Sequence, residues 1–354
     1  IISPWNYPFL LTFQPLISAI AAGNTVLIKP SEISLNTSAL MKQIIDETFA
    51  SDHVCVLEGD KILSQELLKL PFDHIFFTGS TTVGQYVMEQ AAKNLVPVTL
   101  ELGGKSPAII ADDFDLEEAA EKLIWGKVLN LGQTCVAPDY VFIPEYKKDQ
   151  FIEFCLKQIK MKTENQTLPL VINQAHHERL LRLLENAQSN GANIFPTLTR
   201  TANRELGVHL ISLNSQQTIK TKIMQEEIFG PLLPILTYSK IEEAIDFICQ
   251  HDHPLSLYIF SNQSELQKKI LAETYSGDAL INDLIIHFGN HSLPIGGIGK
   301  SGMGKYHGLE GFQVFSHRRT ILKRKYFSSL FRLLYPPYKN YHLKLFRFFI
   351  RMGL

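Results

Sequence analysis

Cys135 is the residue whose surroundings best fit covalent chemistry. It lies in the polar, glycine-flanked segment Gly-Gln-Thr-Cys (132–135), which follows a predicted helix and indicates a turn. A thiol on such a turn can be partly exposed, and backbone N–H groups or a cofactor charge can favour its thiolate, the reactive form. The pattern alone leaves a nucleophile and an inert packing thiol equally open. We interpret the other cysteines, Cys55, Cys155 and Cys249, as packing residues.

A carboxylate and an amide elsewhere in the chain also have the surroundings of site residues. Glu101 ends a predicted strand, and the glycines that follow it in Glu-Leu-Gly-Gly (101–104) free its side chain to point into a cleft. Asn6 lies between two prolines and two aromatic residues in Pro-Trp-Asn-Tyr-Pro (4–8). A rigid amide of this kind can donate a hydrogen bond to a developing oxyanion. The alternatives are a surface carboxylate at a strand end and a hydrogen-bonded turn asparagine.

A glycine-rich turn and a nearby charged pair point to a nucleotide site. Residues 74–84 predict a strand, a turn at Gly79-Ser80 and the start of a helix that includes Gly84. Free N–H groups and the helix dipole suit a phosphate there. The segment is neither a dinucleotide fingerprint nor a P-loop, so a plain strand–helix turn is the alternative. Lys29 and Glu32 follow another strand at the carboxyl edge, where doubly wound sheets bind nucleotides; alternatively they form an exposed loop pair.

The composition excludes several other classes of protein. The chain has 354 residues, with 34 Lys+Arg against 35 Asp+Glu, so its charge gives no bulk reason to bind nucleic acid. Four cysteines without a CxxC pair exclude a disulfide scaffold or zinc ribbon and fit a reducing, cytoplasmic location. No metal site is expected, because the adjacent His176 and His177 point to different faces of a predicted helix. None of the 12 histidines lies in a recognisable hydrolase motif, which disfavours a Cys–His hydrolase.

The elements that must position these residues alternate between helices and short apolar strands. The order in the first hundred residues predicts a doubly wound, largely parallel sheet with right-handed crossovers, and a second series begins near Glu101. Strands are predicted at residues 25–29, 53–57, 74–78, 96–100, 108–111, 140–143, 232–238, 256–260 and 279–282. Helices are predicted at residues 9–22, 36–49, 66–70, 82–94, 116–131, 148–160, 174–189 and 241–250.

The two ends of the chain carry further expectations. The sequence starts Ile-Ile-Ser-Pro-Trp (1–5) without an initiator Met or a charged leader, so it is not a signal peptide, and we expect its beginning to be missing. Residues 342–354 predict a basic amphipathic helix, which can lie on an anionic membrane surface but is too short and too charged to span it. The alternative is a helix that packs on the body or on a second subunit. The predicted apolar face of that helix consists of Leu343, Phe346, Phe349 and Ile350, and the predicted basic face consists of Lys344, Arg347 and Arg351.

Six short segments, taken in order, resemble the aldehyde dehydrogenase superfamily. They are Pro-Trp-Asn-Tyr-Pro (4–8), Lys-Pro-Ser-Glu (29–32), Phe-Thr-Gly-Ser (77–80), Glu-Leu-Gly-Gly (101–104), Gly-Gln-Thr-Cys (132–135) and Glu-Glu-Ile-Phe-Gly-Pro (226–231). Residues 135–140, 293–308 and 315–319 resemble the class 3 branch, which includes fatty and medium-chain aldehyde dehydrogenases. The resemblance implies an α/β fold with a Rossmann-like NAD(P)-binding domain at 1–100 that lacks its N-terminal part. It also implies a catalytic domain at 101–308, followed at 309–354 by an interface strand and the tail.

The same resemblance implies oxidation of aldehydes to carboxylic acids with NAD or NADP. Cys135 would attack the aldehyde to give a thiohemiacetal, and the Asn6 amide with the Cys135 N–H would hold its oxyanion. After hydride transfer, Glu101 would activate the water that hydrolyses the thioester. The implied cofactor residues are Lys29 and Glu32 at the adenosine ribose, Gly79, Ser80 and Gly84 at the pyrophosphate turn, Glu227 at the nicotinamide ribose and Phe229 beside it.

Departures from the family pattern leave alternatives open. The family normally has a further segment before Pro-Trp-Asn, and Ile295 stands where Phe is usual. One alternative is therefore a catalytically incomplete fragment that acts as a binding or structural protein. Another is an enzyme whose thioester is intercepted by coenzyme A. The resemblance implies a homodimer, and the many aromatic residues favour apolar aldehydes as substrates.

Overall fold

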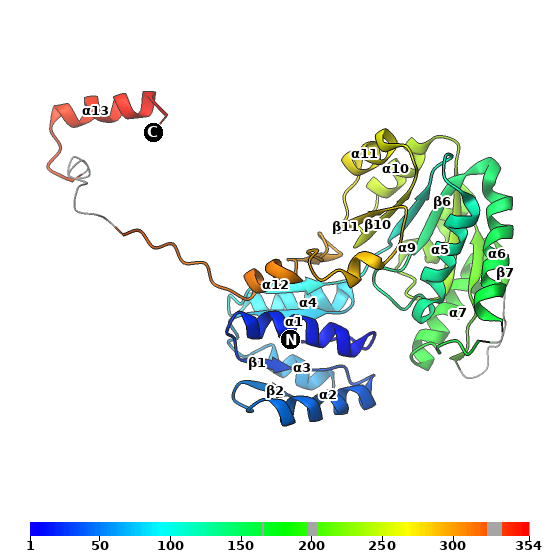
Figure 1. Ribbon diagram of the computed structural model, residues 1–354, viewed down its shortest axis with the longest axis horizontal. Helices are drawn as coiled ribbons and strands as arrows, with labels where there is room; N and C mark the ends of the chain where they lie inside the picture. Colours follow the sequence, from blue (N-terminus) through cyan, green and yellow to red (C-terminus); the bar gives the residue numbers. More distant parts are fainter. Residues whose placement is uncertain (165, 197–203, 324–334, 354) are drawn as a thin grey trace. The chain divides into compact units, whose positions relative to one another are not determined.

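The computed structural model describes residues 1–164, 166–196, 204–323 and 335–353. The chain divides into two units, Ile1–Ser316 and His317–Leu354. The first unit contains every residue that the sequence predicts to be catalytic or cofactor-binding. In Figure 1 its early elements are blue to cyan, and those of its larger sheet are mainly green to yellow.

The larger sheet has seven strands in the order β11-β10-β5-β6-β9-β8-β7. All neighbours are parallel except β7 and β8, which are antiparallel. Every residue of β5, β6 and β10 is buried, as expected for parallel strands covered on both faces. The strands are β5 (Pro107–Ile110), β6 (Tyr140–Pro144), β7 (Asn193–Pro196), β8 (His209–Ser212), β9 (Leu232–Tyr238), β10 (Ser256–Phe260) and β11 (Asp278–Ile281).

Helices cover both faces of this sheet. Val141 and Ile143 of β6 belong to the core beneath α5 (Leu116–Val128) and α6 (Lys148–Thr163). Tyr140 and Phe142 of the same strand belong to the core on the opposite face. This alternation follows from the two-residue period of a strand. The opposite face is covered by α7 (Gln174–Ser189), α9 (Lys222–Gln225), α10 (Ile241–Cys249) and α11 (Ser264–Glu273), and α8 (Ser215–Lys220) precedes α9.

The first hundred residues form two short parallel pairs of strands, β1 (Val26–Ile28) with β2 (Val54–Val56) and β3 (Ile75–Thr78) with β4 (Val98–Glu101). Isolated bridges of Ile2 to Lys29 and Phe77 join the pairs into one layer, which we call the smaller sheet. Residues 1–3 join β1 to β3, because the N–H of Ile2 donates to the Phe76 carbonyl (2.8 Å) and that of Ser3 to the Lys29 carbonyl (3.1 Å). The late strand β12 (Gly302–Met303) returns to this sheet and pairs antiparallel with β4.

Five helices pack on the smaller sheet. The apolar faces of α1 and α2 pack on β1 and β2, and α4 packs on β3 and β4. Asp60 caps α3 by accepting hydrogen bonds from the N–H groups of Ile62 and Leu63, so this helix begins before the predicted 66–70. The helices are α1 (Pro8–Ala21), α2 (Leu35–Thr48), α3 (Lys61–Leu67), α4 (Thr81–Ala92) and α12 (Gly308–Val314).

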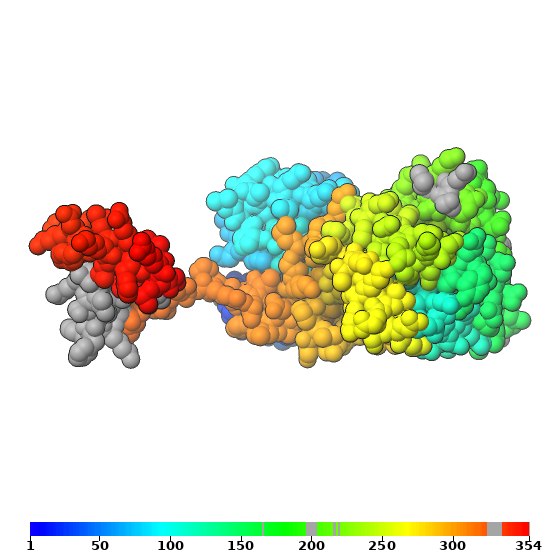
Figure 2. All heavy atoms as spheres, turned by 90° about the horizontal axis from the view of Figure 1, so that it is seen from above, coloured from blue at the N-terminus to red at the C-terminus, as the bar shows by residue number. Residues whose placement is uncertain are grey.

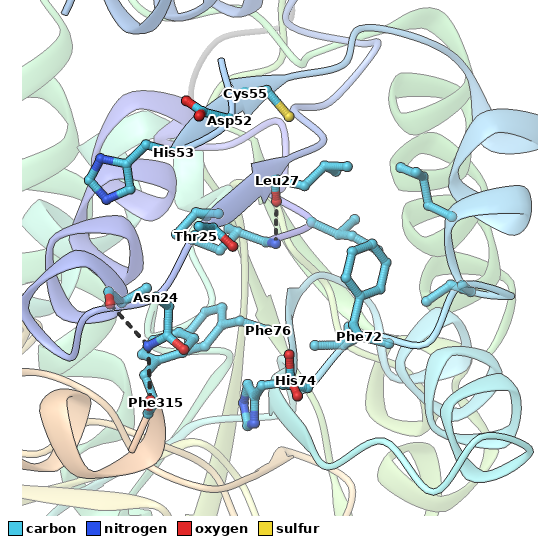
Figure 3. Close-up of a pocket in the computed structure, with 18 of the residues that line it drawn as sticks. Asn24, Thr25, Leu27, Asp52, His53, Cys55, Phe72, His74, Phe76 and Phe315 are labelled. Atoms are coloured by element: carbon cyan, nitrogen blue, oxygen red, sulfur yellow. Dashed lines mark hydrogen bonds between the residues drawn. The ribbon is translucent and has the colours of Figure 1, made fainter. Parts of the chain in front are cut away.

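A cavity of about 250 Å³ lies beside the first residue (Figure 3). The Ile1 nitrogen donates to the Leu27 carbonyl (2.8 Å). At the other side of the cavity the Asn24 amide donates to the Phe315 carbonyl (2.9 Å). No predicted catalytic or cofactor residue lines this cavity. The site must therefore lie elsewhere in the unit.

The predicted α/β fold is confirmed, and each predicted strand and helix has a counterpart. The β7–β8 pair, α8, α9, α11, α12 and β12 were not expected. The expected interface strand is not found in the described residues 309–323 and 335–353, which contain α12 and α13 (Asn340–Arg351) instead; residues 324–334 lie outside the description. The domain limits at 100 and 308 remain predictions. No helix in the described residues is long and apolar enough to cross a membrane.

Candidate active site

One cleft of about 570 Å³ collects nine of the ten predicted site residues. It lies where elements of the smaller sheet meet loops of the larger one. Gly84 is the exception, because it is buried on α4 against the Leu102 side chain and does not line the cleft. The residues that do line it are Asn6, Lys29, Glu32, Gly79, Ser80, Glu101, Cys135, Glu227 and Phe229.

The turn that carries Cys135 has a backbone that only particular residues allow. The helix α5 gives way to the 3₁₀ turn η1 (Leu129–Gly132), in which Asn130, Leu131 and Gly132 all have positive φ. A side chain on Gly132 would lie 2.5 Å from the Gly230 carbonyl oxygen, so the position requires glycine. The predicted helix 116–131 ends earlier for this reason, and the half-buried Cys135 faces the cleft.

Three hydrogen bonds to two other segments fix this turn. The Gln133 amide donates to the Leu170 carbonyl (3.2 Å) and accepts from the N–H of Ile172 (2.9 Å). The Thr134 hydroxyl and the Tyr7 hydroxyl share a hydrogen bond (3.0 Å). The thiol is therefore held in one place relative to residues 4–8, which contain Asn6.

The electrostatic surroundings of Cys135 keep its thiol protonated. Burial, together with the carboxylates of Glu227 and Glu101, raises its pKa to about 12, against the opposing effect of the N–H groups of Cys135 and Val136. The sequence suggested that N–H groups could favour the thiolate, but here burial and the two carboxylates outweigh them. Activation of the thiol requires a positive charge in the cleft or removal of a negative one.

Glu101 is the buried carboxylate at the end of β4. Glu101 is 5% exposed, and its Oε1 atom has no hydrogen-bond partner among the described residues. Burial raises its pKa well above the usual value, Asp278 raises it further and Lys305 lowers it. Its backbone carbonyl accepts the N–H of Gly79 (3.0 Å), which ties the carboxylate to the glycine-rich turn.

Asn6 lies between the end of residues 1–3 and the start of α1. It is buried, and its side-chain amide makes no hydrogen bond within the described part of the chain. Its neighbour Trp5 packs edge-on against Phe229 (5.4 Å between ring centroids) and against His176 (5.5 Å). These aromatic contacts hold the segment, so the Asn6 amide has a fixed place and is available to a ligand.

The glycine-rich turn and the charged pair also line the cleft. Gly79 and Ser80 directly precede α4, and the Ser80 side chain makes no capping hydrogen bond. The N–H groups of the first turn are therefore free for an anion. The buried Lys29 ammonium donates to Glu32 (2.6 Å). Burial alone would raise the pKa of Glu32, but this ammonium holds it below its usual value.

Glu227 is placed by residues that the sequence did not single out. Its carboxylate occupies the space that a side chain on Gly103 would fill. Arg179 donates to the backbone carbonyl of Glu227 (3.1 Å) and to that of Ile228, and the Asp139 carboxylate accepts the N–H of Ile228 (2.9 Å). Burial raises the pKa of Glu227 to about 7, and the Asp139 charge also raises it.

A sequence signal existed for only some of these supporting residues. Asp139 lies in the class 3-like segment 135–140, and Lys105, which forms an ion pair with it, follows the paired glycines. Arg179 and His176 stand on α7 without a local pattern, and only the packing of that helix brings them to the cleft. Among the described residues no group of three or more His, Cys, Asp or Glu side chains could hold a metal ion.

The arrangement matches known proteins along almost the whole chain. The sequence model of the aldehyde dehydrogenase family matches residues 1–321. The chain belongs to the aldehyde dehydrogenase family. Aldehyde dehydrogenase family 3 member A2 of Pongo abelii is 44% identical to this aldehyde dehydrogenase over 359 residues, which cover 99% of this chain and 72% of that protein. The predicted class 3-like branch is confirmed.

Solved structures agree with this assignment. The structure of the substrate-bound state of Staphylococcus aureus AldH superposes with a TM-score of 0.87 at 42% identity, over 99% of this chain and 76% of that one. Mycobacterium tuberculosis aldehyde dehydrogenase complexed with NAD+ gives a TM-score of 0.84 at 27% identity, over 92% and 69%. This aldehyde dehydrogenase therefore oxidises aldehydes with NAD or NADP, and the alternative of a non-catalytic fragment is not favoured.

Proposed function

We propose that Cys135, Asn6 and Glu101 carry out aldehyde oxidation in this cleft, through a thiohemiacetal and then a thioester on Cys135. The observation that supports this most is that these three side chains, from three distant parts of the sequence, line one cleft together with the predicted cofactor residues. Acyl transfer through sulfur needs a nucleophile, an oxyanion donor and a base for the second half of the reaction. The three residues supply one of each.

Each of the three residues has a defined role in the reaction. Cys135 first gives its thiol proton to water, and the thiolate Sγ then bonds to the aldehyde carbon. The resulting oxyanion accepts hydrogen bonds from the Asn6 amide and the Cys135 N–H. One such donor is typically worth about 10²–10³-fold in rate. The thioester that remains after hydride loss is attacked by water, whose proton passes to the Glu101 carboxylate. No histidine is needed beside the thiol, because the aldehyde loses a hydride and not a leaving amine.

The cofactor residues fit the two ends of a dinucleotide. Glu32 can accept ribose hydroxyls while Lys29 donates, and the free N–H groups around Ser80 suit the pyrophosphate. Glu227 and Phe229 line the same cleft as Cys135, and the Glu227 charge acts on the thiol, so we assign these two residues to the nicotinamide ribose and ring. When bound, the oxidised nicotinamide supplies a positive charge near the thiol and accepts the hydride. Gly84 contributes through the packing of α4 and not through contact.

The reaction is tested by mixing the chain with NAD or NADP and aldehydes of increasing length. We expect absorbance of the reduced nicotinamide to rise without coenzyme A, with one carboxylic acid formed per cofactor reduced. Apolar aldehydes are expected to be preferred, because the cleft includes Trp5, Phe77 and Phe229. Turnover that depends on coenzyme A and yields a thioester product would contradict hydrolysis by water.

A pH-dependent prediction follows from the charge beside the thiol. Removing the Glu227 carboxylate in Glu227→Gln removes one cause of the high pKa of Cys135, so that pKa is expected to fall. At pH 9, alkylation of Cys135 by iodoacetamide should become roughly three- to tenfold faster, since one pKa unit is tenfold in thiolate. Peptide mapping separates Cys135 from the other three cysteines.

Glu226→Gln is the matched control for this measurement. Glu226 is the adjacent, exposed glutamate, held by Arg179 at 3.2 Å, and its charge is not among the causes that shift the Cys135 pKa. Its alkylation rate should match that of the unchanged chain. Equal acceleration in both variants, or none in Glu227→Gln, would contradict the electrostatic account of the thiol.

The assembly and location of this aldehyde dehydrogenase are also proposals. We propose a homodimer, and a peripheral membrane contact through α13, on which Leu343 and Ile350 are exposed and Lys344 and Arg347 supply positive charge. The four cysteines are free, which supports a reducing, cytoplasmic location. Sedimentation with anionic vesicles measures the membrane contact, and size-exclusion chromatography with light scattering measures the dimer.

A further inference from the structure

Residues 295–306 connect the two sheets next to Glu101. On one side Gly302 pairs with Glu101 in the β12–β4 ladder. On the other side the backbone of Gly277, directly before β11, packs so closely that a side chain there would lie 2.5 Å from the Gly296 carbonyl oxygen. Figure 2 shows the orange atoms of this part of the chain between the cyan atoms of the smaller sheet and the yellow atoms of the larger one. The carboxylate is thus adjacent to the seam between the sheets.

An ion pair lies across this seam. Lys305 Nζ is 3.7 Å from Asp278 Oδ1 and donates to the Gly277 carbonyl (3.2 Å). The Asp278 side chain is 12% exposed, whereas that of Lys305 is 43% exposed. The charges of Asp278 and Lys305 also act on the buried Glu101 carboxyl. Exposure increases along the series Glu101, Asp278 and Lys305.

The buried members of this series have polar atoms with no assigned partner. Glu101 Oε1, Asp278 Oδ2 and His287 Nδ1 make no hydrogen bond within the described residues. His287 Nε2 lies 3.9 Å from Asp278 Oδ2, and the Ser256 hydroxyl lies 3.3 Å from the same ring nitrogen. Buried polar atoms are costly when unpaired and are commonly joined by buried water. These polar atoms are therefore suited to bind water that carries a proton.

We propose that Asp278 and Lys305 form the outlet through which Glu101 returns to solvent the proton that it takes from the hydrolytic water. This inference rests on the proposed role of Glu101 as the base. The protonated Glu101 carboxyl loses its proton through water to the Asp278 carboxylate, and Asp278 releases it at the surface beside Lys305. Glu101 is again a carboxylate, and no oxidant or reductant is consumed. Asp278 and Lys305 are positioning residues, since they act through Glu101.

The groups around the outlet allow Asp278 to carry a proton transiently. Burial and the Asp278 charge raise the pKa of Glu101, whereas Lys305 lowers it, so the charges of the pair act on this carboxyl. Burial raises the pKa of Asp278 to about 6, against the opposing effects of Lys305 and the Gly296 N–H, so Asp278 can take a proton briefly and release it at neutral pH. The titratable groups that face the outlet are Cys135, Tyr258, His287 and Tyr306, and burial holds His287 neutral by lowering its pKa to about 4.

Asp278→Asn tests the outlet through the two halves of the reaction. The burst of reduced nicotinamide, which reports the first half, should keep its rate within about twofold. Steady-state turnover in dilute buffer should fall roughly tenfold, because proton removal from Glu101 becomes slow. Added imidazole should restore turnover in proportion to its concentration, since a small buffer can collect the proton directly. Asp252→Asn, which removes the carboxylate of the exposed Asp252–Lys300 pair (2.9 Å), should change none of these quantities.

The outcomes of this experiment distinguish a failure of the proposed outlet from a failure of the proposed role of Glu101. Equal slowing of the burst and the steady state without rescue by imidazole, or turnover unchanged in Asp278→Asn, would overturn the outlet. If Glu101→Gln slows thioester hydrolysis and Asp278→Asn does not, only the proposed outlet is wrong. If Glu101→Gln does not slow thioester hydrolysis, the proposed role of Glu101 as the base is wrong. Should Asp278→Asn not fold, Lys305→Gln at the exposed end is measured in the same way, with the same expected loss and rescue.

Discussion

Cys135→Ala is expected to abolish reduction of the cofactor by aldehyde while cofactor binding persists. Turnover should fall on the order of 10⁴–10⁶-fold, because no other group in the cleft can form the thiohemiacetal. The cofactor residues Lys29, Glu32 and Ser80 line the same cleft but take no part in the bond to sulfur, so the substitution should leave cofactor binding in place. Absorbance of the reduced nicotinamide measures turnover, and cofactor binding is measured by protection against unfolding, which is about 2.7 kcal/mol at a cofactor concentration of about 100 times Kd.

Cys55→Ala is the matched control for this loss. Cys55 is also a free, half-buried thiol, but it lies on β2 and outside the cleft. Its removal should leave turnover within about twofold of the unchanged chain. Unchanged turnover in Cys135→Ala, or an equal loss in both variants, would mean that Cys135 is not the nucleophile.

Glu101→Gln is expected to slow the second half of the reaction by about 10²–10⁴-fold. The amide keeps the size of the side chain but cannot accept the proton of the attacking water, so the thioester accumulates. In rapid mixing, one equivalent of reduced nicotinamide per site should appear at nearly the original rate, followed by a much slower phase. Equal slowing of both phases would count against Glu101 as the base for hydrolysis.

The pH dependence of hydrolysis provides a second test of Glu101. The pKa of this buried carboxyl is raised well above its usual value, and only its charged form can accept the proton. Hydrolysis in the unchanged chain should therefore slow as the pH falls through this raised pKa. Because glutamine does not titrate, the residual hydrolysis in Glu101→Gln should lose that limb of the profile.

Much of the site could be predicted because its residues stand in short, characteristic segments. Asn6, Glu101 and Cys135 each lie beside prolines or glycines that fix a turn, and turn chemistry is visible in the local sequence. Gly84 was predicted to bind cofactor because it follows the glycine-rich turn, yet it faces Leu102 inside the unit. A strand–turn–helix pattern identifies the turn but not which side of the first helical turn faces the cleft.

Other features depend on contacts that no local pattern records. The β7–β8 pair is antiparallel in an otherwise parallel sheet, and its residues follow a polar stretch without clear strand periodicity. The raised pKa of Cys135 results from burial and from the charges of Glu227 and Glu101, which are remote in sequence and approach the thiol only in the folded cleft. The link from Glu101 to Asp278 and Lys305 likewise exists only because β12 returns to the smaller sheet.

The most direct measurement of the central claim is mass spectrometry of Glu101→Gln quenched in acid after mixing with aldehyde and oxidised cofactor. We predict a stoichiometric mass increase equal to the acyl group, and peptide mapping should place it on Cys135. The same treatment of Cys135→Ala should give no adduct. An acyl group on another residue, or cofactor reduction without any adduct on Cys135, would contradict the account.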